Sequence, residues 1–148
     1  MNPKKFFSAE QQDTIVNAIK AAELNTSGEI RVHVENHCKG DVLDRSVMVF
    51  NMLKMKETAA RNGVLIYLAV ADRKFAIIGD EGINVLVEHD FWNDVKDEMS
   101  RHFREGDFTG GVVNGILRVG EKLKAFFPYQ SDDVNELPDD ISFGKEEA

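Results

Sequence analysis

The chain lacks the features that mark secreted, membrane-spanning and disulfide-bonded proteins. It has one cysteine, Cys38, which excludes a disulfide within the chain. Its longest apolar run, residues 64–71, is too short to cross a bilayer. The first residues contain two lysines with no apolar run after them, so they do not look like a secretory signal. We therefore expect a cytoplasmic protein without membrane insertion.

Motifs for nucleophilic catalysis and for phosphate or zinc binding are also missing. The chain has no GxSxG motif and no Walker phosphate loop, and Cys38 has no evident base beside it. His33 and His37 lie in or just after an expected strand rather than on a helix, so exposed histidines are favoured over a zinc site. The loop at 106–111 opens a helix and could hold an anion, but its own Asp107 opposes this unless a cation bridges them.

The charge is acidic and unevenly distributed. Of the net charge of −8, residues 131–148 carry seven acids and one lysine, and the charges of the remaining chain nearly balance. The absence of a basic patch argues against nucleic acid and anionic membranes as partners. The pattern predicts one domain over residues 1–128, followed by an acidic tail at 129–148 that is solvated and partly mobile. The alternative is a tail that attracts cations or binds a partner.

Hydrophobic periodicity predicts an α/β fold with a mixed sheet. Residues 29–35 alternate between charged and apolar, which predicts a half-buried strand with one face near solvent. Residues 64–70 are apolar throughout, as in a strand covered on both faces. A helix from 41 to about 60 connects them with the length of a parallel crossover, and its apolar residues lie almost all round, so we expect packing on more than one side. Residues 75–78 return antiparallel after a turn.

Three more helices are expected. The first begins after Ser8 with a capping box and ends near residue 24. The second spans about 83–104, with a break near residues 89–90. The last ends before Pro128 and contains three glycines, Gly111, Gly115 and Gly120. Each glycine costs about 1 kcal/mol of helix propensity, so we expect close packing against another element in compensation.

Carboxylates are expected at both edges of this sheet. Glu29, Asn62, Asp80 and Glu81 stand at strand ends that share one edge, although they are far apart in sequence. Three carboxylates and an amide oxygen are hard ligands suited to Ca²⁺ or Mg²⁺. The alternative is a polar turn in which Asp80 or Glu81 caps the following helix.

The opposite edge is a competing site. Asp72 follows the strand at 64–70, and Asp107 lies there too if the helix at 83–104 runs the length of the sheet. Ligands of α/β sheets usually bind at this edge, by the carboxyl ends of the parallel strands. The alternative for Asp72 is a structural role, because aspartate is a common first residue of a turn.

Three segments in combination resemble one known family. NGVLIYLAVADRKFAIIGDEGI begins at Asn62, TSGEIRVHVE begins at Thr26 and FREGDFTGGVVNGI begins at Phe103. Together they resemble the TPM domain, named for thylakoid-lumen, photosystem II repair and nematode receptor-modulator proteins. The resemblance covers about residues 8–127. Most relatives also have a signal peptide and often a membrane helix, so this chain resembles a stand-alone soluble branch.

The resemblance implies a three-layer α/β/α sandwich that binds a divalent cation, Ca²⁺ or Mg²⁺, through acidic loop residues. It also implies acid phosphatase activity, which is attributed to some plant members. The positions that match the family's motifs are Asn62, Gly63, Asp72, Gly79, Gly82 and Asp107. Many members fill the position of Asp80 otherwise, so its role as a ligand is an inference from this sequence.

Three functional hypotheses follow. The first is a cation-binding module, ordered by Ca²⁺ or Mg²⁺, that contacts another protein or an assembly. The second is a metal-dependent phosphatase acting on phosphomonoesters, in which a cation held by the acidic loops polarises the phosphoryl group and activates water. It ranks lower because the sequence offers no unique nucleophile or general base. The third is an interaction domain without a metal.

Overall fold

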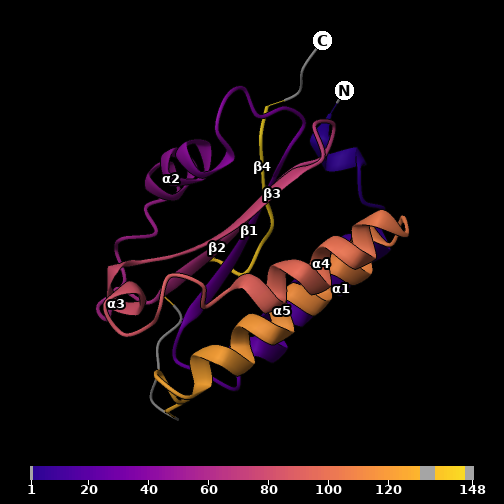
Figure 1. Ribbon diagram of the computed structural model, residues 1–148. Coiled ribbons are helices and arrows are strands. Elements are labelled where there is room, and N and C mark those ends of the chain that lie inside the picture. The colour runs from indigo at the N-terminus through magenta and orange to yellow at the C-terminus, as the bar shows by residue number, and fades with distance from the viewer. Residues whose placement is uncertain (1, 131–135, 146–148) are drawn as a thin grey trace.

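The computed structural model describes residues 2–130 and 136–145 (Figure 1). The helices are η1 (Pro3–Lys5), α1 (Ala9–Glu23), α2 (Val42–Met52), α3 (Glu81–Asn84), α4 (Asn93–Arg104) and α5 (Phe108–Lys124). The strands are β1 (Glu29–Glu35), β2 (Gly63–Ala69), β3 (Lys74–Gly79) and β4 (Ser142–Phe143). The capping box of α1 is present, since the Ser8 side chain accepts from the Gln11 backbone and the Gln11 side chain from that of Ser8.

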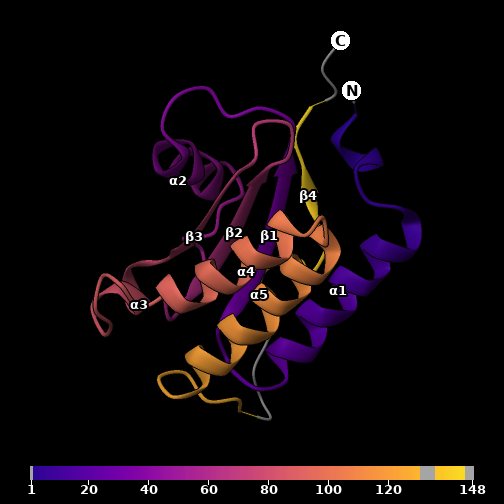
Figure 2. The ribbon, with the colours of Figure 1, turned by 45° about the vertical axis from the view of Figure 1, so that its right-hand side comes forward.

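The strands form one mixed sheet in the order β3-β2-β1-β4. β1 is parallel to β2 and to β4, whereas β3 is antiparallel to β2. Helices α1, α4 and α5 cover one face of the sheet and α2 covers the other (Figures 1 and 2). The predicted α/β class and the three-layer sandwich with a mixed sheet are therefore confirmed.

Strand β2 is the centre of the molecule. All seven of its residues are buried, as its continuous apolar sequence predicted. Val64, Ile66 and Leu68 pack in the core formed with the three-helix layer. Leu65 and Tyr67 belong to the second core, under α2. The strand alternates between the two cores because successive side chains point to opposite faces.

Strand β1 departs from its predicted environment. Its charged face was expected near solvent, but Glu29, His33 and Glu35 are only 4–5% exposed. The prediction of exposed histidines is therefore also wrong for His33. The charged face lies on the side of the sheet that carries α2, and the C-terminal segment pairs with the outer edge of β1. Alternation along a strand reports which residues share a face, but it does not report what covers that face.

Helix α2 is shorter and less covered than predicted. It ends at Met52 rather than near residue 60, and Lys54 just beyond it has a positive φ of 57°. One side packs on the sheet through buried Val49 and Phe50. Apolar residues on the rest of the helix are 50–64% exposed, namely Leu43, Val47, Met48 and Met52. The prediction of packing on more than one side is wrong for the chain as described.

The described part of the C-terminal tail packs on the sheet. Leu137 is 6% exposed, and its amide donates to the Glu29 carboxylate. The chain then follows β1 as β4, and the Gly144 amide donates to the Val34 carbonyl. The prediction of a solvated end is therefore wrong for Leu137 and β4, whereas Glu136, Asp140 and Lys145 are exposed. The acids at positions 132, 133, 146 and 147 lie outside the described residues.

The glycines of α5 pack closely against neighbouring helices, as the sequence predicted. A Cβ at Gly111 would meet the Phe103 ring at 2.5 Å, and one at Gly115 would lie 2.5 Å from the Met99 sulfur. Both neighbours belong to α4, which follows the predicted break between α3 and α4. A Cβ at Gly120 would lie 2.9 Å from Cβ of Ala22 and 3.2 Å from its carbonyl oxygen, on α1. The absence of side chains on α5 thus lets two helices approach it closely.

We predict that Gly120→Ala lowers the free energy of unfolding by about 1–3 kcal/mol, because α1 and α5 must separate to admit the methyl group. Gly115→Ala is the matched control, since the three atoms nearest to its methyl group all belong to the flexible side chain of Met99 and alanine gains helix propensity. Urea unfolding followed by circular dichroism measures both changes. A Gly120→Ala variant as stable as the parent would show that the contact between α1 and α5 is not tight.

Candidate functional site

The amino-end edge of the sheet gathers the first group of predicted ligands. Both oxygens of Asp80 accept from the Arg61 guanidinium, at 2.8 and 2.9 Å, and one also accepts from the Glu81 amide at 2.7 Å. Asp80 is therefore the N-cap of α3, which is the structural alternative weighed from the sequence. The side chain of Glu81 is 72% exposed and lies 3.5 Å from Arg61. A guanidinium thus neutralises the carboxylate that a cation would need.

Glu29 and Asn62 also lie at this edge, and both side chains form hydrogen bonds with backbone groups. The Glu29 amide donates to the Asn62 carbonyl at 3.3 Å, which places the two residues side by side. The Asn62 amide group donates to the Ser27 carbonyl at 3.3 Å, and the Leu137 amide donates to the Glu29 carboxylate at 2.6 Å. Burial raises the pKa of the Glu29 carboxyl, so its environment disfavours the charged form.

A further acidic contact closes this edge. Burial and a hydrogen bond with Asp139 of the tail raise the pKa of Glu23 to about 9. Glu23 also accepts from the Ile30 amide at 3.0 Å. Glu23 therefore keeps its proton at neutral pH. This contribution to stability is complete below pH 4.5 and is lost as the pH rises towards 9.

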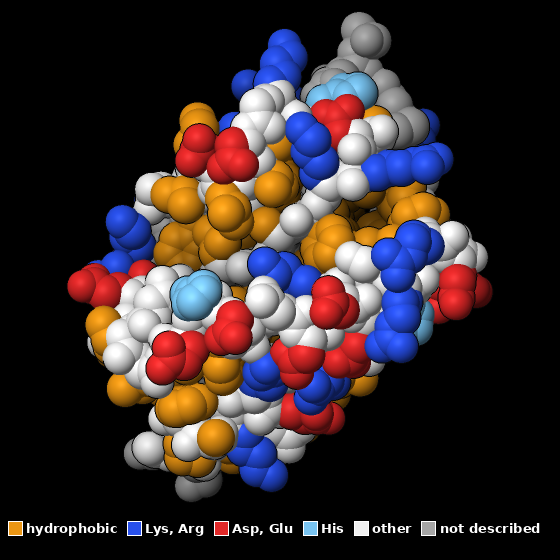
Figure 3. All heavy atoms as spheres, in the orientation of Figure 1, with side chains coloured by type: hydrophobic (Ala, Val, Ile, Leu, Met, Phe, Trp, Pro, Cys, Tyr) orange, Lys and Arg blue, Asp and Glu red, His pale blue; other side chains and the backbone are white. Residues whose placement is uncertain are grey.

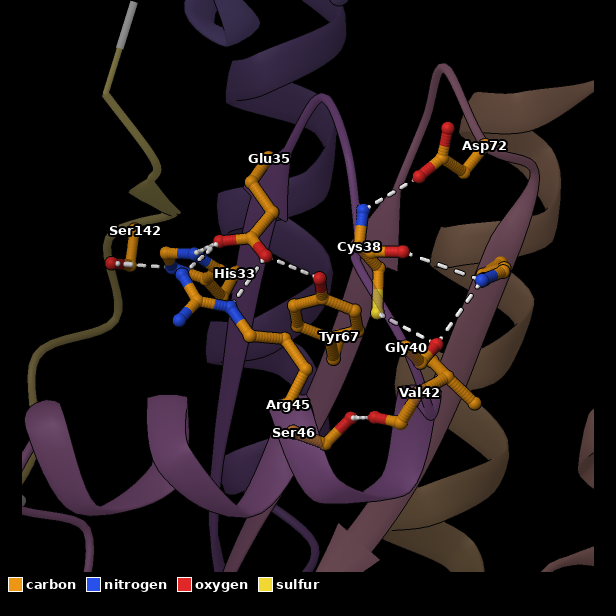
Figure 4. A network of polar contacts seen from close by, with 11 residues as sticks. His33, Glu35, Cys38, Gly40, Val42, Arg45, Ser46, Tyr67, Asp72 and Ser142 are labelled. Carbon is orange, nitrogen blue, oxygen red and sulfur yellow. Dashed lines mark hydrogen bonds and ion pairs between the residues drawn. The ribbon is translucent and has the colours of Figure 1, made fainter.

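The carboxyl-end edge holds the second predicted pair. Asp72 accepts from the Cys38 amide at 2.7 Å and contacts Nδ1 of His37 at 2.9 Å (Figure 4 shows the first contact). Asp107, the N-cap of α5, accepts from the Gly110 amide at 3.0 Å and contacts Nδ1 of His102 at 3.0 Å. The histidine first, and then the amide, lowers the pKa of each aspartate. Both are therefore anionic at neutral pH.

Neighbours of Asp72 and Asp107 in the sequence line one cavity of about 600 Å³, although the two aspartates themselves do not. Arg73 follows Asp72 and lines this cavity, as do Gly106 and Phe108 on either side of Asp107. Figure 3 shows it as a hollow with hydrophobic walls, edged by basic side chains. The expectation that both aspartates share the carboxyl-end edge is consistent with this placement.

The two edges differ in their capacity for a cation. Within residues 2–130 and 136–145, no three or more His, Cys, Asp or Glu side chains form a group that could hold a metal ion. At the amino-end edge both carboxylate oxygens of Asp80 already accept hydrogen bonds from Arg61, so they are poorly available as metal ligands. At the carboxyl-end edge the side chains of Asp72 and Asp107 are 29% and 55% exposed, and each carboxylate retains lone pairs. A hydrated cation needs only one or two protein carboxylates.

A buried polar network was not predicted from the sequence (Figure 4). The Glu35 carboxylate accepts from the Arg45 guanidinium at 2.8 and 2.9 Å, contacts Nε2 of His33 at 3.0 Å and accepts from the Tyr67 hydroxyl. The other nitrogen of His33 contacts the Ser142 hydroxyl at 3.0 Å. These hydrogen bonds, that of Arg45 first, outweigh burial and lower the pKa of Glu35 to about 2.

Comparison with known proteins decides the family. A family model described as the TPM domain matches residues 1–122. The chain belongs to the TPM domain family. The fold agrees, because the BA42 protein from the psychrophilic bacterium Bizionia argentinensis is 49% identical, with a TM-score of 0.89 over 94% of this chain and 96% of that one.

More distant structures share the fold of this TPM domain. The N-terminal domain of a protein from P. gingivalis is 20% identical, with a TM-score of 0.67 over 82% of this chain and 78% of that one. The N-terminal domain of the cg2496 protein from Corynebacterium glutamicum is 14% identical, with a TM-score of 0.62 over 96% and 82%. A comparison with curated proteins found no match.

Gly82 of the TPM domain is required by a close approach of two backbone segments. A Cβ at this position would be 2.2 Å from the Ala60 carbonyl oxygen, so only glycine lets α3 fold back on the loop that carries Arg61.

Among the described helices, none has the length and apolarity needed to cross a membrane.

The sequence did not identify His37, Arg61 and His102 as partners of the aspartates at the two edges. Only His102 lies near its partner in the sequence, five positions before Asp107, whereas Arg61 and His37 are 19 and 35 positions from theirs.

We predict that Glu35→Gln lowers the free energy of unfolding of the TPM domain at pH 7 by about 3 kcal/mol, because it leaves Arg45 and Tyr67 without a charged acceptor. The native pKa of about 2 lies below the ordinary 4.5. The carboxylate's contribution is therefore complete above pH 4.5 and is lost as the pH falls towards 2. Denaturant unfolding between pH 7 and 2.5 should show a larger decline in the parent than in the variant, which keeps only the contributions of other carboxylates with lowered pKa, such as Asp72 and Asp107.

Glu57→Gln is the control, because Glu57 is exposed and its side chain makes no hydrogen bond or ion pair in the described structure. Its stability should stay within about 0.5 kcal/mol of the parent at every pH. If Glu35→Gln behaved in the same way, the network would not contribute to stability.

Proposed function

We propose that this TPM domain binds Ca²⁺ or Mg²⁺ at the carboxyl-end edge, through Asp72 and Asp107, and that it acts by contacting another protein. The contrast between the two edges carries the proposal. Arg61 holds the oxygens of Asp80, whereas Asp72 and Asp107 are accessible and ionised, and within residues 2–130 and 136–145 each binds a histidine nitrogen and a backbone amide. Mg²⁺ dehydrates reluctantly and keeps several waters, which suits a site with two carboxylates.

The exposed side of α2 supports the protein partner. Leu43, Val47, Met48 and Met52 are each at least half exposed, and hydrophobic side chains gather over this helix in Figure 3. Contiguous apolar surface on a folded domain commonly marks an interaction site, and methionine side chains adapt to a partner's shape. The cytoplasm is the compartment we propose, because the one cysteine is a buried free thiol.

We predict that Ca²⁺ or Mg²⁺ at millimolar concentration shifts amide NMR signals around Asp72 and Asp107 and leaves those around Asp80 and Glu81 in place. Asp72→Asn and Asp107→Asn should each weaken binding about tenfold or more, because each removes a charged ligand. Asp97→Asn is the matched control, since Asp97 is an exposed aspartate on α4. Shifts centred on Asp80, or none at all, would refute the proposed site.

A metal-dependent phosphatase acting on phosphomonoesters is the second candidate. The observation that favours it is the pair of arginines beside the aspartates, Arg73 and Arg104, because guanidinium groups bind phosphate oxygens well. A bound cation would supply charge neutralisation and a water of lowered pKa. The aspartates would hold that cation, and the arginines would orient the phosphate group at the mouth of the cavity.

We predict that turnover of 4-nitrophenyl phosphate by this chain requires added Mg²⁺ or Ca²⁺. The rate should fall at least tenfold in the double variant that combines Asp72→Asn and Asp107→Asn. Absorbance of the released nitrophenolate measures the rate. Asp97→Asn should retain the parent rate. Turnover that survives in the double variant would come from a contaminating enzyme and would count against catalysis here.

A further inference from the structure

The cavity at the carboxyl-end edge has an apolar interior that neither a cation nor a phosphate group would use. It has a volume of about 600 Å³ and lies among the end of β2, the β2–β3 turn, the residues after η1, and helices α4 and α5. Aliphatic side chains contribute to its lining, namely Leu68, Val70 and Val112. Ligand pockets typically have volumes of about 300–1,000 Å³ and mostly apolar walls.

Aromatic rings form a continuous wall around this space. Phe75 meets Phe103 edge to face, with centroids 5.1 Å apart and planes at 89°. Phe103 stacks on Phe108 at 5.8 Å, and Phe108 meets Phe6 edge to face at 5.4 Å. All four rings line the cavity. Such a wall presents both faces and edges, the two surfaces with which another aromatic ring packs favourably.

The residues that edge the cavity are basic, although the chain has a net charge of −8. Arg73, Lys74 and Arg104 line it and are exposed. Lys74 donates to the carbonyls of Cys38 and Gly40, and its charge also interacts with the Asp72 carboxylate. Among the residues that the structure describes, neither Arg73 nor Arg104 has an acidic partner.

The acids nearest in sequence, Asp72 and Asp107, do not line the cavity and form no ion pair with Arg73 or Arg104 among the described residues. Asp72 and Asp107 are each bound to a histidine nitrogen and to a backbone amide. By contrast, Arg118 on the outer side of the same helix layer contacts three carboxylates, those of Asp94, Glu98 and Glu121. Arg73 and Arg104 therefore differ from Arg118, whose charge is neutralised by ion pairs that join α4 and α5.

We propose that this cavity binds a small organic anion with an aromatic body, its ring against Phe75, Phe103 and Phe108 and its carboxylate facing Arg73 and Arg104. Charge complementarity selects an anion, and the aromatic wall selects a flat apolar body. An inorganic anion would leave the wall uncovered, and a neutral ring would leave the guanidinium groups without a partner. The site goes beyond the proposed cation site and does not require a metal.

The test compares two probes of matched shape and opposite charge, 2-naphthoate and 2-naphthylmethylammonium. Each is titrated into the protein in the presence of EDTA, and amide and aromatic NMR signals are followed. We expect 2-naphthoate to shift signals of Phe75, Phe103 and Phe108 at concentrations at least about tenfold lower than the ammonium probe requires. Equal binding of both probes would overturn the proposal, as would shifts confined to the exposed side of α2.

Variants separate the charge from the shape. Arg73→Gln with Arg104→Gln should weaken 2-naphthoate binding about tenfold and leave the ammonium probe unchanged. Arg101→Gln is the matched control, because Arg101 is an exposed arginine on α4 that does not line the cavity. Ser100→Phe should block both probes by filling the cavity from α4.

These results stay interpretable whatever the cation does. The arginine variants change only exposed side chains, so they test the proposal even if Ser100→Phe fails to fold. Because EDTA is present, failure of Ca²⁺ or Mg²⁺ to bind cannot prevent 2-naphthoate from binding. Conversely, naphthoate that does not bind at millimolar concentration overturns the aromatic-anion site and leaves the cation titration as it stood.

Discussion

The carboxylate of Glu35 is the contact on which the α2 side of the sheet depends. It accepts from Arg45 of α2 and Tyr67 of β2, and His33 connects it to Ser142 of β4. Taking a charge out of water costs several kcal/mol unless its partners are well placed, so loss of any one of these elements leaves a buried charge exposed to that cost. One side chain on β1 thus holds a helix, the central strand and the tail in register.

That arrangement decides which edge of the sheet stays open. Because β1 and β2 pair in parallel from Glu29 opposite Gly63 to Glu35 opposite Ala69, the two strands begin at one edge and end at the other. The tail that pairs with β1 enters at the first edge, where Leu137 binds Glu29 and Arg61 holds Asp80. The other edge has no such cover in the described structure, and its cavity is lined by the residues next to the accessible aspartates in the sequence, Arg73, Gly106 and Phe108.

The sequence predicted the positions of the strands better than the contacts that their side chains make. Continuous and alternating apolar residues located β1, β2 and β3, because burial against two layers leaves a direct periodic signal. The same alternation could not show that Glu35 is buried, since its cover comes from Ser142 and its neighbours more than a hundred positions away. Likewise Asp72, Asp80 and Asp107 were placed at their edges, but the groups bound to them depend on side-chain directions that no spacing reports.

The two surfaces assigned to ligands lie on opposite sides of the sheet. The cavity opens among residues of the three-helix layer, and the exposed side of α2 lies on the other face (Figure 2). Between them stands β2, buried at every position, and a close-packed strand resists the repacking that would carry a signal across it. Lys74 is shared by both sides, because it lines the cavity and donates to the Cys38 and Gly40 carbonyls just before α2. The contact between the cavity and the segment before α2 therefore runs through one exposed side chain at the sheet edge and does not pass through the core.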